Sequence, residues 1–91
     1  RLMIDPNNSS ILYFASRKNG LWRKKGNKLW KKININLPID SSDPGITFIL
    51  FDKNSPLINN STSKIYIGVY GLGVMKSNNA GQSWAQTINF M

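Results

Sequence analysis

The chain has 91 residues, a formal net charge of +8, and neither cysteine nor histidine. These absences exclude disulfides, thiol nucleophiles, zinc-finger ligand sets and histidine-dependent triads, so we expect no metal and no cofactor. No apolar run is long enough to cross a bilayer, so a membrane is not expected as a partner. Stability must therefore come from apolar burial, within this chain or against neighbouring chain.

The predicted elements form two copies of one four-strand pattern. In chain order, the apolar and aromatic runs of the first copy are 2–5, 11–15, 20–23 and 29–33. Those of the second copy are 48–52, 64–69, 73–76 and 83–88. Turns rich in Asn, Gly, Ser, Asp and Pro separate the runs, and no stretch shows sustained helical periodicity. The offset between the copies is nearly constant, at 53 residues from Tyr13 to Tyr66 and 54 from Trp30 to Trp84.

A period near fifty residues with four strands per unit is the signature of a β-propeller blade. The sequence therefore predicts an all-β fold, a β-propeller fragment of two consecutive four-stranded antiparallel blades. We place the first blade at 1–38, the inter-blade link at 39–45 and the second blade at 46–91. Two blades are too few to close a propeller, so we expect further blades in a parent chain, or self-association of the isolated piece.

The turn between the last two strands of the second copy carries a motif. It reads Ser77-Asn78-Asn79-Ala80-Gly81-Gln82-Ser83-Trp84 and resembles the Asp-box, Ser-x-Asp-x-Gly-x-Thr/Ser-Trp, of many propeller blades. The motif positions are Ser77, Asn79, Gly81, Ser83 and Trp84, and we expect them to be structural. Asn79 keeps the acceptor that bonds backbone amides but loses the charge, and Gly81 permits a tight turn. Trp84 is expected to plug the gap between blades.

The surrounding sequence resembles the xyloglucanases of glycoside hydrolase family 74. The similar strings of the first copy are Asp5-Pro6-Asn7, Leu12-Tyr13-Phe14-Ala15-Ser16-Arg17 and Asn19-Gly20-Leu21-Trp22-Arg23, and those of the second are 45–52 and 64–69. The resemblance implies two seven-bladed propellers flanking a cleft that binds xylosylated β-glucan. It also implies inverting hydrolysis by two Asp residues, one from each propeller. The implied partners are this polysaccharide and the remaining blades of the parent chain.

The resemblance also indicates where a catalytic residue would lie. In the family's first blade, one catalytic Asp lies in the second-to-third-strand turn. The corresponding turns here, 16–20 and 70–73, contain no acid, so we expect no catalytic residue in this piece. Alternate turns lie on opposite rims of a blade, which places these two turns and the link on one rim. Asp40 and Asp43 of the link could line the cleft, although a solvated loop is the favoured interpretation.

Four residues near this rim are candidates for substrate binding. Arg17 and Asn19 could hydrogen-bond sugar hydroxyls, and Trp22 or Tyr70 could stack on a sugar face. A wedge between blades is the competing interpretation of Trp22. Trp30 and Trp84 are predicted to lie in the core, and Asp5 and Asp52 are predicted turn residues on the opposite rim.

Three functions remain open. The leading hypothesis is a fragment of a secreted glycoside hydrolase that acts on xyloglucan-type β-glucan by inversion, the fragment supplying scaffold and cleft rim. The alternative is a non-catalytic Asp-box propeller that binds protein partners, like the sortilin-type receptors. The third is polyanion binding by the positive charges of 17–32, which also suit a solvated hairpin edge. Few aromatic residues interleave with those charges, so nucleic acid is not an expected partner.

Overall fold

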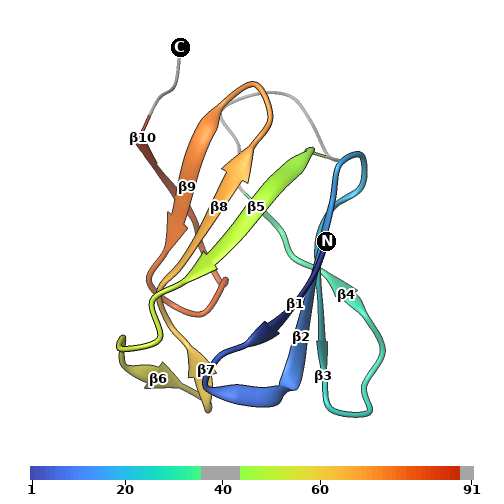
Figure 1. Ribbon diagram of the computed structural model, residues 1–91, viewed down its shortest axis with the longest axis vertical. Coiled ribbons are helices and arrows are strands. Elements are labelled where there is room, and N and C mark those ends of the chain that lie inside the picture. The colour runs from blue at the N-terminus through green and yellow to red at the C-terminus, as the bar shows by residue number, and fades with distance from the viewer. Residues whose placement is uncertain (36–43, 89–91) are drawn as a thin grey trace.

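The computed structural model describes residues 1–35 and 44–88, and the regular structure of these ranges is entirely β-strand (Figure 1). The first sheet has the order β1 (Leu2–Asp5), β2 (Asn8–Ser16), β3 (Gly20–Lys25) and β4 (Lys31–Lys32). The second has the order β10 (Ala85–Ile88), β9 (Gly73–Ser77), β8 (Ile65–Val69) and β5 (Ile46–Phe51). Both sheets are antiparallel, so the predicted pair of four-stranded blades is confirmed. The blade boundaries themselves stay predictions, since 36–43 lie outside the described residues.

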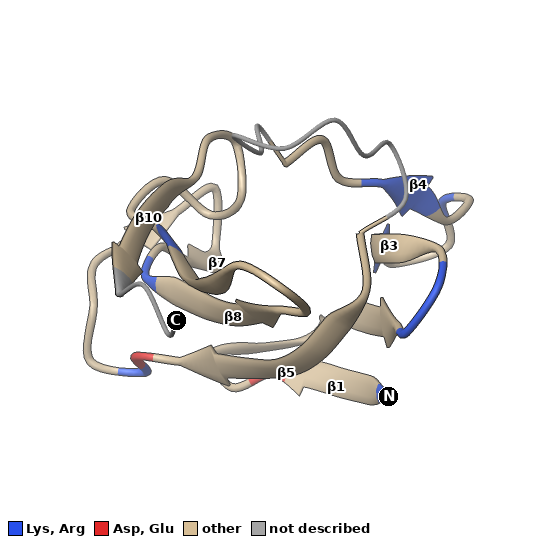
Figure 2. Ribbon diagram, turned by 90° about the horizontal axis from the view of Figure 1, so that it is seen from above, with Lys and Arg blue, Asp and Glu red and all other residues tan. Residues whose placement is uncertain are grey.

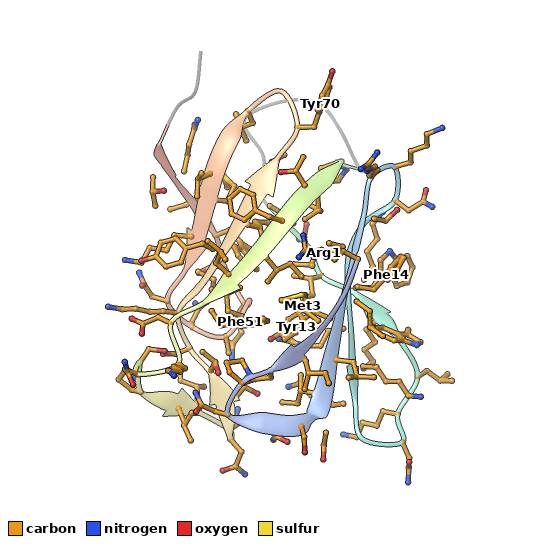
Figure 3. All side chains as sticks on the ribbon, in the orientation of Figure 1. Arg1, Met3, Tyr13, Phe14, Phe51 and Tyr70 are labelled. Carbon is orange, nitrogen blue, oxygen red and sulfur yellow. The ribbon has the colours of Figure 1, made fainter. Side chains whose placement is uncertain are left out.

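A core lies between the two sheets because each strand alternates between a buried and an outward face. In β2 the buried side chains are Ile11, Tyr13 and Ala15, while Phe14 points outward and is 42% exposed. Figure 3 shows Tyr13 beside Phe51 of the second sheet, with Phe14 on the far side of the ribbon. The rings of Tyr13 and Phe51 lie 5.3 Å apart and tilted, in the range where aromatic pairs attract.

The segment between β5 and β8 forms a short hairpin that contacts the first sheet. Its strands are β6 (Leu57–Ile58) and β7 (Ser61–Thr62). The carboxylate of Asp5 is 1% exposed and accepts hydrogen bonds from the backbone N–H and the hydroxyl of Thr62, at 3.0 and 2.5 Å. It also accepts the N–H of Asn7 at 2.9 Å, so the predicted turn role is confirmed. The same side chain therefore joins the two halves of the chain.

The outer faces of both sheets carry apolar side chains that nothing in the described chain covers. On the first sheet, Leu2 and Ile4 are 57% and 56% exposed, on the same face as Phe14. On the second sheet, Leu50 is 59% exposed. Contiguous exposed apolar surface is uncommon on monomeric proteins and favours association.

We expect the isolated chain to elute from a sizing column above its monomer mass of 10.3 kDa. The double variant Ile4→Lys/Phe14→Lys should shift elution toward the monomer, because it charges the outer face of the first sheet. Leu57→Lys is the matched control, since Leu57 is 53% exposed but lies on the small hairpin. A wild-type chain that elutes as a monomer would contradict the expectation.

The buried phenol of Tyr13 is expected to make the free energy of unfolding fall at alkaline pH. Burial raises the pKa of Tyr13 above its ordinary value of 10.0, and the hydrogen bond from Arg23 opposes this rise. The pKa of Tyr13 is higher in the folded chain than in the unfolded chain. The stabilisation that comes from burying the neutral phenol is therefore fully present below about pH 10, and it is lost as the pH rises through the folded pKa. Urea unfolding of wild type and Tyr13→Phe between about pH 9 and 12 checks this, and the variant should lose less stability with pH. Parallel pH profiles would refute it.

Candidate functional site

Two of the predicted substrate-binding residues meet at one pocket. Arg17 of the β2–β3 turn and Tyr70 of the β8–β9 turn line a hollow of about 420 Å³, together with Lys18, Gly45 and Thr47. Tyr70 is 79% exposed and projects from the end of the second sheet, as Figure 3 shows. The two turns lie at the same end of their sheets (Figure 1), as the alternation of turns predicted.

Gly45 holds these two turns together through its backbone. Its carbonyl accepts the N–H of Tyr70 at 2.9 Å. A Cβ atom at position 45 would lie 2.5 Å from the carbonyl oxygen of Arg17, so only glycine permits this approach. The first turn is itself closed by the Ser16 hydroxyl, which accepts the N–H groups of Lys18 and Asn19 at 3.2 and 3.0 Å. The pocket is therefore shaped by backbone contacts between three separate segments.

The other two candidates lie in a different place. Asn19 and Trp22 line a hollow of about 550 Å³ with Phe14 and Trp30. The indole N–H of Trp22 donates to the carbonyl of Asn19 at 2.8 Å. Because Trp22 pairs with Phe14 across β2 and β3, it belongs to the outer face of the first sheet. The structure thus brings Arg17 to Tyr70 and Asn19 to Trp22, and does not gather all four.

The predicted burial of Trp30 is wrong for this chain, because its side chain is 38% exposed. The fourth strand of the first sheet is only two residues long, and Trp30 precedes it, outside the interface between the sheets. The predicted burial of Trp84 is confirmed, since it is 8% exposed within the core.

In the turn before β10, the side chains of Ser77 and Asn79 accept hydrogen bonds from backbone amides, as was expected for the motif. Oδ1 of Asn79 accepts the N–H of Ser83 at 2.9 Å, and its Nδ2 donates to the Ser83 hydroxyl at 2.7 Å. The Ser77 hydroxyl accepts the N–H of Gly81 at 2.8 Å, and Gly81 has a φ of 88°. The neutral amide of Asn79 therefore bonds this turn without a charge, although the assignment of the turn as an Asp-box stays a prediction.

A contact across the two sheets was not expected from the sequence. Nη1 of Arg23 donates to the carbonyl of Ala80 at 2.5 Å and to the hydroxyl of Tyr13 at 3.4 Å. Its guanidinium also lies 5.7 Å from the centre of the Tyr13 ring. The backbone N–H of Ala80 donates to Ser63 at 3.0 Å, so both polar groups of this residue are bonded. Arg23 thus ties the first sheet to the motif turn of the second.

Among residues 1–35 and 44–88, no carboxylate lines either of the two pockets at the candidate residues. Asp52, like Asp5, closes a turn, because its Oδ1 accepts the N–H of Asn54 at 3.1 Å. Asp40 and Asp43 lie outside the described residues. Across 1–35 and 44–88, no group of three His, Cys, Asp or Glu side chains could hold a metal ion. The described lining residues of these pockets can therefore offer hydrogen bonds and aromatic faces, and no pair of carboxylates for acid–base chemistry.

In the same described ranges there is no helix with the length and apolar character to span a membrane.

Comparison with known proteins gives sequence and structural relatives. No family model matches the chain. It is 34% identical to a xyloglucanase of Paenibacillus sp over 92% of its own length, and 33% identical to a xyloglucanase of Hypocrea jecorina over 93%. It is similar to the solved GH74 enzyme of Niastella koreensis, with a TM-score of 0.74 and 33% identity over 98% of this chain. The GH74 xyloglucanase of Xanthomonas campestris gives a TM-score of 0.76 and 28% identity over 100%.

The fold and these relatives define the class: an all-β, two-sheet portion of a β-propeller. Within that class, the chain belongs with the xyloglucanases of glycoside hydrolase family 74. It spans only 10% and 12% of the two sequence relatives, and 14% and 15% of the two solved chains. It corresponds to a part of those proteins.

Proposed function

We propose that this chain is part of a glycoside hydrolase that cleaves xyloglucan-type β-glucan with inversion. In this proposal the chain supplies scaffold and one stretch of the rim of the substrate cleft. The observation that supports it most is the pairing of Arg17 with Tyr70 in one pocket, on a fold shared with xyloglucanases.

The pocket suits binding of a neutral sugar chain. The guanidinium of Arg17 can donate hydrogen bonds to hydroxyl groups, and the exposed ring of Tyr70 offers a face for sugar C–H groups. Inverting hydrolysis needs a general acid and a general base on opposite sides of the scissile bond. No carboxylate of residues 1–35 and 44–88 lines the pocket, so in this proposal both groups come from outside the described residues. The role we propose here is substrate contact.

The test uses the full-length protein that contains these 91 residues, incubated with xyloglucan and assayed for new reducing ends. Arg17→Ala and Tyr70→Ala should each raise KM by about threefold to tenfold with little change in kcat, since each removes one contact worth about 1 kcal/mol. Lys53→Ala is the control, because Lys53 is exposed and lies outside the pockets described here. Absence of hydrolysis by the unmodified protein would overturn the enzyme proposal and favour the non-catalytic, protein-binding alternative.

Export from the cell is part of the proposal, because an enzyme that cleaves a polysaccharide polymer meets its substrate outside the cell. Four Asn-x-Ser/Thr triplets support it, and they begin at Asn7, Asn8, Asn59 and Asn60. Asn60 is exposed, and its carbonyl accepts the side-chain amide of Asn8 at 3.0 Å. Mass spectrometry of the culture medium and of the washed cells checks this part. Protein found only in the cell fraction would count against export.

A further inference from the structure

A third pocket, of about 350 Å³, lies between the β3–β4 hairpin of the first sheet and the motif turn of the second. The cationic residues of its lining are Arg23, Lys25, Lys28, Lys31 and Lys32, and none of the described residues that line it is acidic. The motif turn and the Tyr70 turn lie at opposite ends of the second sheet (Figure 1). In Figure 2 both residues of β4 are blue, while the red Asp positions lie by β1 and β5. The pocket is therefore a positively charged site separate from the candidate substrate rim.

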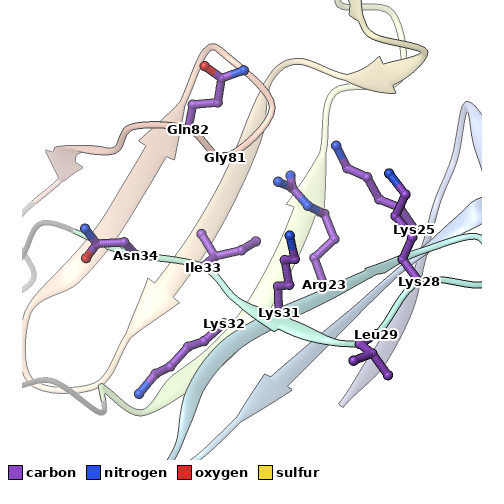
Figure 4. Close-up of a pocket in the computed structure, with 10 residues that line it drawn as sticks. All are labelled: Arg23, Lys25, Lys28, Leu29, Lys31, Lys32, Ile33, Asn34, Gly81 and Gln82. Carbon is purple, nitrogen blue, oxygen red and sulfur yellow. The ribbon is translucent and has the colours of Figure 1, made fainter.

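The cationic groups converge. Figure 4 shows the side chains of Arg23, Lys25, Lys28 and Lys31 extending to one side, whereas Lys32 points the other way. The bonds to Ala80 and Tyr13 fix the guanidinium of Arg23 at one wall. In the part of the chain that the structure describes, Lys25, Lys28 and Lys31 form no ion pair or hydrogen bond through their ammonium groups. Three ammonium groups thus share one space in which no carboxylate of the described ranges lies.

The crowding has an electrostatic cost that a bound anion would relieve. Partial burial lowers the pKa of Lys25 below its ordinary 10.5, and the neighbouring charges of Arg23, Lys28 and Lys31 lower it further. Like charges that are held together disfavour each other's charged forms, and an opposite charge within about 4–6 Å reverses this. An anion placed among the ammonium groups would therefore be attracted by all of them.

The other residues that line the pocket indicate which class of anionic ligand it could bind. Asn34 and Gln82 are exposed amides that can donate to and accept from hydroxyl groups. None of the described residues that line the pocket is aromatic, so they form no stacking platform of the kind that binds single-stranded nucleic acid. We infer that this pocket binds the anionic groups, carboxylate or sulfate, of an acidic polysaccharide. This inference concerns a charged polymer and does not rest on xyloglucan hydrolysis.

The binding test uses calorimetric titration of the 91-residue chain with polygalacturonate, with dextran sulfate and with neutral dextran. Either anionic polymer should bind, and the one that binds more tightly identifies the carboxylate or the sulfate as the preferred group. Affinity should fall steeply between about 0.05 and 0.5 M salt, because exposed charges are screened. Neutral dextran should not bind. An oligothymidylate of matched charge is included, and tighter binding of that probe would overturn the assignment to polysaccharide.

The site is located by a matched pair of double variants. Lys28→Gln/Lys31→Gln and Lys53→Gln/Lys64→Gln each remove two positive charges, but only the first pair lines the pocket. The first should weaken binding by about tenfold, as expected for the loss of two solvent-exposed ion pairs, and the second by less than about twofold. Far-UV circular dichroism confirms that both variants keep their strands. Equal weakening by both variants would show that overall charge is responsible, and would sink the inference.

A measurement on the wild-type chain alone completes the test. The backbone amide signals of Gly81 and Gln82 should shift on addition of the anionic polymer, since both residues line the pocket. Shifts confined instead to the Arg17 and Tyr70 turns would place the anion at the other rim and contradict the assignment. If neither anionic polymer binds at low salt, the inference that this pocket binds an acidic polysaccharide is wrong.

Discussion

Replacing Trp84 with alanine is expected to destabilise the chain by about 3–5 kcal/mol, the usual cost of emptying a large buried aromatic site. Trp84 is 8% exposed and belongs to the core cluster between the sheets. Its indole N–H also donates to the carbonyl of Gly81 at 3.2 Å, so the change removes a donor from the motif turn. Urea unfolding followed by far-UV circular dichroism measures the loss, which is a large part of the roughly 5–15 kcal/mol that stabilises a typical domain.

Trp30→Ala is the matched control, because it removes the same side chain from the equivalent position of the first copy. Trp30 is 38% exposed and lies outside the core cluster, so we expect a cost of about 1 kcal/mol or less. The two tryptophans are 54 residues apart in the repeat, which makes the comparison internal to one chain. Equal costs for the two variants would mean that the sheets do not pack on Trp84 as described.

The strands could be predicted because their signal is local. Side chains at 11, 13 and 15 face the core and alternate with outward residues, which is the period of a pleated strand. The repeat then divided the predicted strands into two units of four, and each of the two large sheets has four strands. The fourth strand of the first copy was predicted too long, because Leu29 is apolar yet 85% exposed. The local sequence pattern does not distinguish an apolar residue at the edge of a sheet, which only a neighbouring sheet would cover, from an apolar residue in the core.

The candidate site was predicted only in part, because its contacts join distant segments. The turn rule placed Arg17 and Tyr70 at one end of the fold, and the structure brings them to one pocket. The bond from Arg23 to Ala80 spans 57 residues, and no periodicity or turn signal reports such a pairing. The positive charge of the β3–β4 hairpin was visible in the sequence, but its convergence on a pocket depends on the motif turn of the other sheet.

Asp5→Ala is expected to destabilise the chain by about 3 kcal/mol, because it leaves a buried N–H without its charged acceptor. The carboxylate accepts two hydrogen bonds from Thr62 and one from Asn7. Asp52→Ala is the matched control from the second copy, and should cost about 1 kcal/mol or less, since within the described chain the Asp52 carboxylate accepts one local turn N–H, from Asn54. Urea unfolding of both variants gives the comparison, and similar costs would show that the buried bonds to the hairpin add nothing.

A double-mutant cycle separates the contact between the two halves from the turn. Thr62→Ala removes the hydroxyl that Asp5 accepts, and the pair should show a coupling of about 1–2 kcal/mol. The N–H of Thr62 survives this change, so the coupling reports the Thr62 hydroxyl, which donates to Asp5 and accepts the side-chain amide of Asn7 at 3.0 Å. Since Asp5 belongs to the first sheet and Thr62 to the hairpin of the second half, a measurable coupling means that the two halves unfold together. Additive costs, within about 0.5 kcal/mol, would mean that each sheet is held by its own residues and that the buried carboxylate acts only on its turn.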